Sequence, residues 1–305
     1  MAESTGGTTH LDGLQNAVGR ELAAMLARPL AGGLYLVATP IGNLGDVSLR
    51  ALAVLARADV LYCEDTRHSH KLLDRYGIRR RLRSLHEHNE DNELNGVLAE
   101  LAAGRSIAII SDAGTPLVSD PGFKLVRAAL EGGLAVFAVP GASAVLAALT
   151  SSGLPTDCFT FAGFLPVKSG QRLERLRELE HVAGTLVFFE APGRLAATLA
   201  ALAEVFGSQC PAAVARELTK LHEESRRGSL AEILQWANSA QIKGEVVIAV
   251  APMRALDRQV SEEEIAQAIA GQTDGTLRDR VVAVAARLRA PRKRVYDIAL
   301  RSRKD

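Results

Sequence analysis

The chain has 305 residues, of which 48% are hydrophobic, and a formal net charge of +1. This length allows about two domains with ordinary cores. The near-zero net charge excludes a global electrostatic attraction to nucleic acid. No stretch approaches the ~18 consecutive apolar residues that span a bilayer. The three cysteines are widely separated and form no C-x-x-C pair, which favours a reducing compartment, and hence the cytoplasm, over a disulfide framework.

Residues 1–31 are expected to form a mobile N-terminal tail with room for one short helix, because they contain acidic residues and no continuous apolar core. From 32 to 155 the chain alternates apolar runs with helix-like segments. The runs lie at 33–38, 59–64, 106–110 and 135–140, and the helical patterns at 49–58, near 72, at 123–130 and at 143–153. This alternation predicts parallel strands with crossover helices, which is an α/β domain.

A Gly- and Pro-containing link near residue 155 leads into a second alternating series, which predicts another α/β domain over residues 156–253. Residues 254–305 contain three short helical patterns and no strand candidate. From Arg278 to Asp305 there are ten Lys and Arg against three Asp, an excess of seven positive charges. The predicted fold class is therefore α/β, with two α/β domains, a cleft between them and a small, basic C-terminal helical extension.

The loop SDAGTPLVSDPG follows a predicted strand, where ligands of parallel sheets gather. It matches neither the dinucleotide fingerprint nor the phosphate-binding P-loop. Its Gly114 permits a ligand to approach the main chain beside Asp112 and Thr115. Asp120, which precedes a proline, suits the N-cap of the next helix. A further loop, PGASA, would present free helix amides and the Ser143 hydroxyl to a polar ligand.

Two charged runs also follow predicted strands. The run CEDTR places Glu64, Asp65 and Arg67 together, and it fits a capped helix N-terminus as well as a catalytic site. The run ARELTKLHEE, at 215–224, is typical of surface ion pairs, but its place at a strand end favours a site. Two H-x-H pairs are present, yet the first would diverge on a helix and no further ligand cluster is evident, so no metal is expected.

In this order and spacing, YLVATPIGNLGDVSLRA, CEDTRHSHKLL, ISDAGTPLVSDPG, VPGASA, FAGFLP and ARELTKLHEE resemble the tetrapyrrole methylase superfamily of S-adenosylmethionine enzymes. Within it the chain is most similar to the branch that methylates the ribose 2′-oxygen of a cytidine in the decoding region of 16S ribosomal RNA. The resemblance covers roughly residues 33–252, and the basic extension is also similar. It implies S-adenosylmethionine as the cofactor, folded in the cleft between the domains and held largely by main chain.

The resemblance also implies site residues. The cofactor-binding positions are Pro40, Asp112, Gly114, Thr115, Ser143, Ala144, Phe164 and Leu218, with Gly244 and Glu245 at a strand start. A ribose hydroxyl must lose its proton to a carboxylate or histidine. The candidate bases are Glu64, Asp65, Glu87 and His88, with Glu217 and Glu223 opposite. The residues expected to bind RNA are Arg67, Arg216 and Lys220 near the cleft, and Arg292, Lys293 and Arg294 in the extension.

The implied partner is 16S ribosomal RNA in the small ribosomal subunit, and the implied assembly is a homodimer. Two alternatives stay open. A corrin or uroporphyrin methyltransferase of the same superfamily would share the cleft but would not need the basic extension. A non-catalytic ribosome assembly factor would keep the cleft as a relic, and failure to bind S-adenosylmethionine would favour it.

Overall fold

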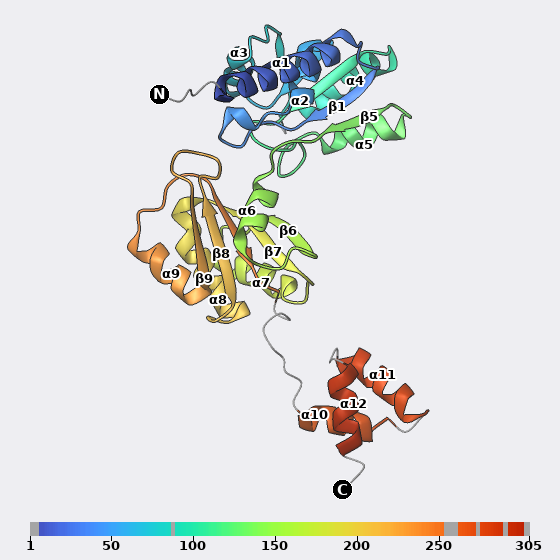
Figure 1. The fold of residues 1–305 in the computed structure, drawn as a ribbon, viewed down its shortest axis with the longest axis vertical. Helices are drawn as coiled ribbons and strands as arrows, with labels where there is room; N and C mark the ends of the chain where they lie inside the picture. The colour runs from blue at the N-terminus through green and yellow to red at the C-terminus, as the bar shows by residue number, and fades with distance from the viewer. Residues whose placement is uncertain (1–5, 87–88, 253–261, 273–274, 289–291, 302–305) are drawn as a thin grey trace.

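A computed structural model describes residues 6–86, 89–252, 262–272, 275–288 and 292–301. Figure 1 shows two α/β domains followed by a separate group of helices near the C-terminus. The predicted fold class is confirmed. Differences from the sequence-based expectation lie at the domain boundary, at the N-terminus, in two edge strands, and in the helices at 90–102 and 230–239, for which no helical pattern was named.

The first domain contains a five-stranded parallel sheet, as the alternating pattern predicted. Its strands, in the order β3-β2-β4-β1-β5, are β1 (Gly33–Val37), β2 (Val60–Cys63), β3 (Leu82–Ser84), β4 (Ser106–Ile110) and β5 (Val136–Val139). Helices α2 (Leu49–Arg57) and α3 (Thr66–Arg75) cover one face. Helices α4 (Glu90–Ala102) and α5 (Phe123–Glu131) cover the other. A 3-10 turn, η1 (Leu44–Asp46), follows β1. Because both faces are covered, the central strands β1, β2 and β4 are almost entirely buried and apolar.

The second domain contains a mixed five-stranded sheet. Its strands, in the order β6-β7-β10-β8-β9, are β6 (Phe159–Phe164), β7 (Thr185–Glu190), β8 (Pro211–Arg216), β9 (Glu224–Ser229) and β10 (Val246–Val250). Only the β6–β7 pair is parallel. One face is covered by α7 (Ser169–Leu179), α8 (Leu195–Phe206), which follows the turn η2 (Pro192–Arg194), and α9 (Leu230–Ser239).

Helix α6 (Ala144–Ser152) covers the other face of this second sheet. Its Val145 and Leu149 pack against Val187 of β7 and Val247 of β10, together with Ile41 from the first domain. The chain therefore passes to the second domain before α6, whereas the sequence-based boundary lay at residue 155. Gly153 and Pro155 follow α6. Such residues mark the end of a helix without showing which sheet the helix covers.

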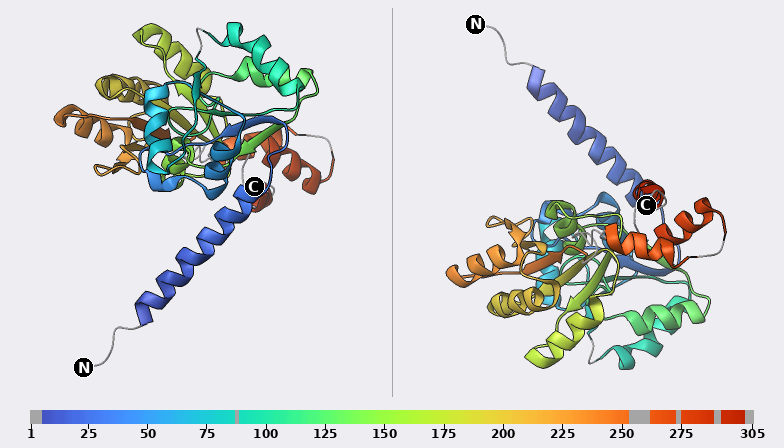
Figure 2. Two further views of the ribbon diagram at one scale, coloured as in Figure 1. Left: turned by 90° about the horizontal axis from the view of Figure 1, so that it is seen from above. Right: turned by 90° about the horizontal axis from the view of Figure 1, so that it is seen from below.

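Helix α1 (Gly6–Ala27) occupies most of the segment that was expected to be a tail with one short helix. Many of its residues are Ala, Leu, Glu, Gln, Arg or Met, which favour helix, whereas Gly13 and Gly19 weaken the pattern. The helix packs against α2, and Figure 2 shows it extending away from the first domain. Leu11, Leu14 and Val18 remain exposed, at a spacing that puts them on one face.

The three helices of the C-terminal group are α10 (Glu262–Ala270), α11 (Leu277–Leu288) and α12 (Arg292–Arg301). They share a small core of their own, in which Ile265, Val284, Val295 and Ile298 are nearly inaccessible to solvent. Three helices were expected over residues 254–305, and the described part of this segment contains three.

Candidate cofactor pocket and its surroundings

A pocket of about 460 Å³ is lined by loops of both domains. It lies at the carboxyl ends of β1 and β4, at the start of α6, and beside the segments 189–192 and 244–247 of the second domain. This volume is in the range of ordinary small-molecule sites. Six of the eight residues predicted to bind the cofactor line it, namely Asp112, Gly114, Thr115, Ser143, Ala144 and Phe164. Gly244 and Glu245 line it as well.

The loop after β4 is held against the loop after β1 by a two-residue bridge. The Thr39 amide donates to the Gly114 carbonyl at 2.8 Å, and the Gly114 amide donates to the Thr39 carbonyl at 3.1 Å. Gly114 has φ +81°, a conformation that strains residues with a side chain. Leu117 and Ser119, in the same loop, also have positive φ. Such strain persists only where the surrounding structure fixes it, and it clusters at ligand sites.

The third loop ends at the N-cap of α6. The Ser143 hydroxyl accepts a hydrogen bond from the Leu146 amide at 3.4 Å, so this side chain caps the helix and also lines the pocket. The first amides of a helix lack intrahelical partners and carry a partial positive charge. The α6 N-terminus is therefore suited to a polar or anionic edge of a ligand in this pocket.

The other two predicted cofactor residues lie elsewhere. Pro40 lines a neighbouring cavity. Leu218 is 7% exposed and packs with Ile41 and Val145 in the core between the domains. The residues on either side of it, Glu217 and Thr219, both have positive φ. Leu218 is placed to shape the base of the site rather than to line its wall.

Sequence reasoning missed Glu190, which ends β7 and lines the pocket. Its carboxylate is buried, accepts hydrogen bonds from the Thr198 hydroxyl at 2.5 Å and the Ala191 amide at 2.8 Å, and pairs with Arg194 at 3.2 Å. The available signal was a carboxylate at the end of a predicted strand, shortly before Pro192-Gly193. Glu64 shares with Glu190 only its place at a strand end.

A group of carboxylates lies beside the pocket. Asp120 lines the pocket and, with Glu64, a small adjoining cavity. Burial, reinforced by the negative charges of Glu64 and Asp112, raises the pKa of Asp120 to about 6. Asp120 is not the N-cap of α5, contrary to the sequence-based expectation. Gly122 holds that position with φ +113°, and Asp120 instead lines the pocket.

Asp65 caps α3, one of the two roles foreseen for it. Its carboxylate accepts the Arg67 amide at 2.8 Å, and this hydrogen bond holds the pKa of Asp65 below its usual value. Its own amide donates to Asp112 at 3.1 Å, which ties the two loops together. Glu87 and His88, the other candidate bases, lie outside the described residues.

The cations expected to bind RNA near the cleft differ in availability. The Arg67 side chain is 92% exposed. Arg216 pairs with Glu224 at 2.7 Å, while Lys220 lies between Glu217 at 2.9 Å and Glu245 at 3.3 Å. In the extension, Arg292 and Lys293 are exposed and Arg294 is half-buried. Their binding to RNA stays a prediction.

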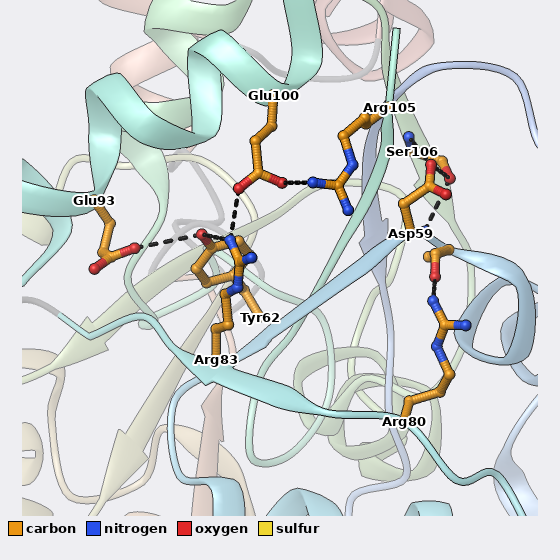
Figure 3. Close-up of polar contacts among 9 residues, drawn as sticks. Asp59, Tyr62, Arg80, Arg83, Glu93, Glu100, Arg105 and Ser106 are labelled. Atoms are coloured by element: carbon orange, nitrogen blue, oxygen red, sulfur yellow. Dashed lines mark hydrogen bonds and ion pairs between the residues drawn. The ribbon is translucent and has the colours of Figure 1, made fainter. Parts of the chain in front are cut away.

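A second basic segment was missed. Between Arg67 and Arg83 there are seven Lys and Arg and one Asp, an excess of six positive charges. Figure 3 shows that Arg83 is held by Tyr62 and Glu100. Arg80 donates to the Ala58 carbonyl. Lys71, Arg75, Arg79 and Arg81 are exposed, and among the described residues none of the four forms an ion pair. We call these four residues the α3–β3 cations.

Among the described residues, no group of three or more His, Cys, Asp or Glu side chains is arranged to hold a metal ion. A helix that is long and apolar enough to cross a bilayer is likewise absent from the described part of the chain.

Comparison with solved structures gives the class of fold. The uroporphyrin-III-C-methyltransferase of Thermus thermophilus superposes with a TM-score of 0.51 at 23% identity, covering 74% of this chain and 96% of that one. At this identity the likeness shows the fold alone.

Sequence comparison gives the family. Residues 33–234 match the Tetrapyrrole (Corrin/Porphyrin) Methylases, and the chain belongs to this family. A protein of Mesorhizobium japonicum named ribosomal RNA small subunit methyltransferase I is 57% identical over 230 residues, which are 75% of this chain and 78% of that protein. The protein of the same name from Synechocystis sp. is 42% identical over 272 residues, 88% of this chain and 98% of its own length.

Proposed function

We propose that the chain is an S-adenosylmethionine-dependent methyltransferase that acts on the ribose 2′-oxygen of a cytidine in the 16S ribosomal RNA of the small subunit. The single observation that carries this proposal is the 57% identity to a small-subunit ribosomal RNA methyltransferase over three quarters of the chain. The pocket supports it, because the loops that resemble the cofactor loops of the family converge on one cavity.

The residues of the pocket fit S-adenosylmethionine. Gly114 leaves the main chain open to a ligand, Phe164 and Val247 provide apolar wall, and the α6 N-terminus provides free amides. Asp112 contributes a negative charge, which is suited to a sulfonium cation. When bound, the cofactor would supply a methyl group activated by its positively charged sulfur. The contribution of the protein is to hold the acceptor oxygen in line with that methyl group and to receive a proton.

Asp120 and Glu64 are the pair best placed to receive the proton of the acceptor hydroxyl. A general base works best when its pKa lies near the working pH. The half-buried Asp120 has a pKa of about 6, whereas Asp65 has a lowered pKa and is engaged as a helix cap. We therefore assign the role of base to the Asp120–Glu64 pair. Glu64 was one of the candidate bases that the sequence implied, whereas Asp120 was expected only as a helix cap.

The alternatives have weaker support. The tetrapyrrole methyltransferase reported above is 23% identical to this chain, whereas the RNA methyltransferase relatives are 42% and 57% identical. A non-catalytic assembly factor would not need an Asp120–Glu64 pair beside an intact pocket. The basic helical extension and the α3–β3 cations also favour a polyanionic substrate.

The same proposal includes the setting of the reaction. We place the enzyme in the cytoplasm, where small subunits are assembled, and as a homodimer. The exposed stripe of Leu11, Leu14 and Val18 on α1 supports self-association, since apolar side chains at this spacing pair well with a second helix. Sedimentation of the full chain and of a chain that lacks residues 1–31 would test the dimer. A monomer in both cases would contradict it.

The test of the function is incubation with radiolabelled S-adenosylmethionine and one of three substrates. These are naked 16S RNA, assembled small subunits from a strain that lacks the modification, and uroporphyrinogen. Label in the RNA of one of these substrates supports the proposal. Label in uroporphyrinogen and none in RNA supports the tetrapyrrole alternative. No S-adenosylmethionine binding in calorimetry supports the assembly factor.

A further inference from the structure

A second cavity, of about 230 Å³, adjoins the cofactor pocket. It lies between the loop after β1, which contributes Pro40 and Leu44, and the first half of α3, which contributes His68 and Lys71. Asp112 lines both cavities, so the two meet at this residue. The second cavity has half the volume of the first and, like it, opens at the carboxyl ends of the parallel strands.

The wall of this second cavity has unused hydrogen-bonding capacity. Ser69, on the wall, is 4% exposed, and its hydroxyl has no hydrogen-bond partner among the described residues apart from a weak interaction with the Cys63 thiol. A buried hydroxyl without a good partner costs free energy, so such groups call for an explanation. By contrast, the Thr39 hydroxyl is already used, since it donates to the Ser111 carbonyl at 3.1 Å.

The charge around the second cavity is positive. Lys71 lines the cavity and is in no ion pair among the described residues, and His68 lies one turn before it on α3. The other three α3–β3 cations follow Lys71 along the chain. Arg75 lies one turn further along α3, and Arg79 and Arg81 lie between α3 and β3. Cations without protein partners favour an anionic ligand, and a series of them favours a polyanion rather than a single small anion.

We propose that this second cavity receives the acceptor nucleotide of the RNA, turned out of its strand. The base would lie against Pro40 and Leu44, its phosphate would contact Lys71 and His68, and its ribose would reach the Asp112 boundary with the cofactor pocket. Enzymes that modify a nucleotide commonly extrude it in this way. The α3–β3 cations would hold the phosphates of the flanking nucleotides. This inference rests on the proposed function and adds the site of its substrate.

The test compares His68→Ala and Lys71→Met with His70→Ala in the full-length enzyme. His70 is an exposed histidine on the same helix, but it does not line the cavity, so it is a matched control. Single-turnover methylation of assembled small subunits is measured over a salt series. Calorimetry with S-adenosylmethionine measures cofactor affinity for each protein.

His68→Ala and Lys71→Met should each lower the rate at subsaturating subunit by about tenfold, because each removes a polar contact to a phosphate. Lys71→Met should also reduce the salt slope by about one. Cofactor affinity should stay within about twofold, and His70→Ala should resemble wild type. If the wild-type enzyme methylates subunits and both variants match His70→Ala, the inference about the second cavity is overturned and the proposed function stands. A wild-type enzyme that transfers no methyl group to RNA overturns the proposed function and this inference with it.

Discussion

Gly114 is the residue at which the backbone shapes the cofactor pocket. Gly114→Val should abolish S-adenosylmethionine binding, because a β-branched residue is strained at φ +81° by roughly 1–3 kcal/mol and the loop would shift. The added Cβ would also lie 3.4 Å from a methyl group of Ile41, which lines the pocket. Calorimetry measures the binding, and circular dichroism checks the fold.

The control for this change is Gly133→Val. Gly133 has φ +69°, follows α5 and has open space where a Cβ would lie, so it carries similar strain away from the pocket. Undiminished affinity in a folded Gly114→Val protein, or an equal loss in the control, would remove this loop from the site.

Asp120 gives a prediction about pH. If its carboxylate must be ionised to accept the proton, the single-turnover rate should rise with pH and level off, with a midpoint near pH 6. Glu64→Gln removes a neighbouring negative charge and should move the midpoint to lower pH. A profile without a step between pH 5 and 7 would exclude Asp120 as the base.

Asp120 also affects stability. Its pKa in the folded chain is about 6, above the ordinary aspartate value of 3.8, so the folded state holds the proton more tightly than the unfolded state. This stabilisation is complete below pH 4 and is lost as the pH rises through 6. Asp120→Asn should therefore be more stable than wild type at pH 8, by about 1 kcal/mol after allowance for solvent screening. It should gain nothing at pH 4, as urea unfolding can measure.

Among individual residues, those in strand-end loops were predictable and those that depend on tertiary packing were not. Asp112, Gly114 and Ser143 follow apolar runs that read as strands, and all three line the pocket. Leu218 was carried over from a motif, but the fold turns its side chain into the core. The place of Asp120 beside the pocket could not be predicted from the sequence, because an Asp-Pro pair is as typical of a helix N-cap as of a binding site.

At the scale of elements, α6 joins the two domains. Leu149 is 2% exposed within the core formed by α6, the second sheet and Ile41, whereas Leu146 on the same helix is 50% exposed. Leu149→Ala should lower the free energy of unfolding by about 2–5 kcal/mol. Leu146→Ala should change it by less than about 0.5 kcal/mol. Equal effects in denaturant titration would show that α6 does not anchor the second domain.

The central strands were predictable because burial on both faces makes them continuous apolar runs. The edge strands β3 and β9 were missed because their sequences, LRS and ESRRGS, contain almost no apolar residue. These strands form because they pair with β2 and β8, and this pairing depends on the tertiary structure rather than on their own sequence. The spacing of apolar residues at 143–153 predicted a helix, but it likewise could not show that this helix, α6, covers the second sheet.

At the scale of the whole molecule, positive charge is concentrated in the C-terminal extension and in the segment from Arg67 to Arg83. Truncation after Pro252 should weaken binding to the small subunit and reduce its salt dependence, with S-adenosylmethionine affinity nearly unchanged. Neutralising Arg292, Lys293 and Arg294 together should give a milder loss, about one unit of salt slope per phosphate contact. Because the α3–β3 cations remain, some salt dependence should persist. Equal binding by truncated and full-length chains across a salt titration would show that the extension does not dock the RNA.

The most direct test of the central claim is the chemical position of the transferred methyl group. Small subunits from a strain that lacks the modification are incubated with the enzyme and labelled S-adenosylmethionine, and the purified 16S RNA is digested with alkali. A 2′-O-methyl ribose cannot attack its neighbouring phosphate, so its phosphodiester bond survives. Ribose 2′-O-methylation of one cytidine predicts that the label is recovered in a single alkali-resistant dinucleotide that begins with a methylated cytidine. Label in mononucleotides would place the methyl group on a base, and RNA without label would contradict the assigned reaction.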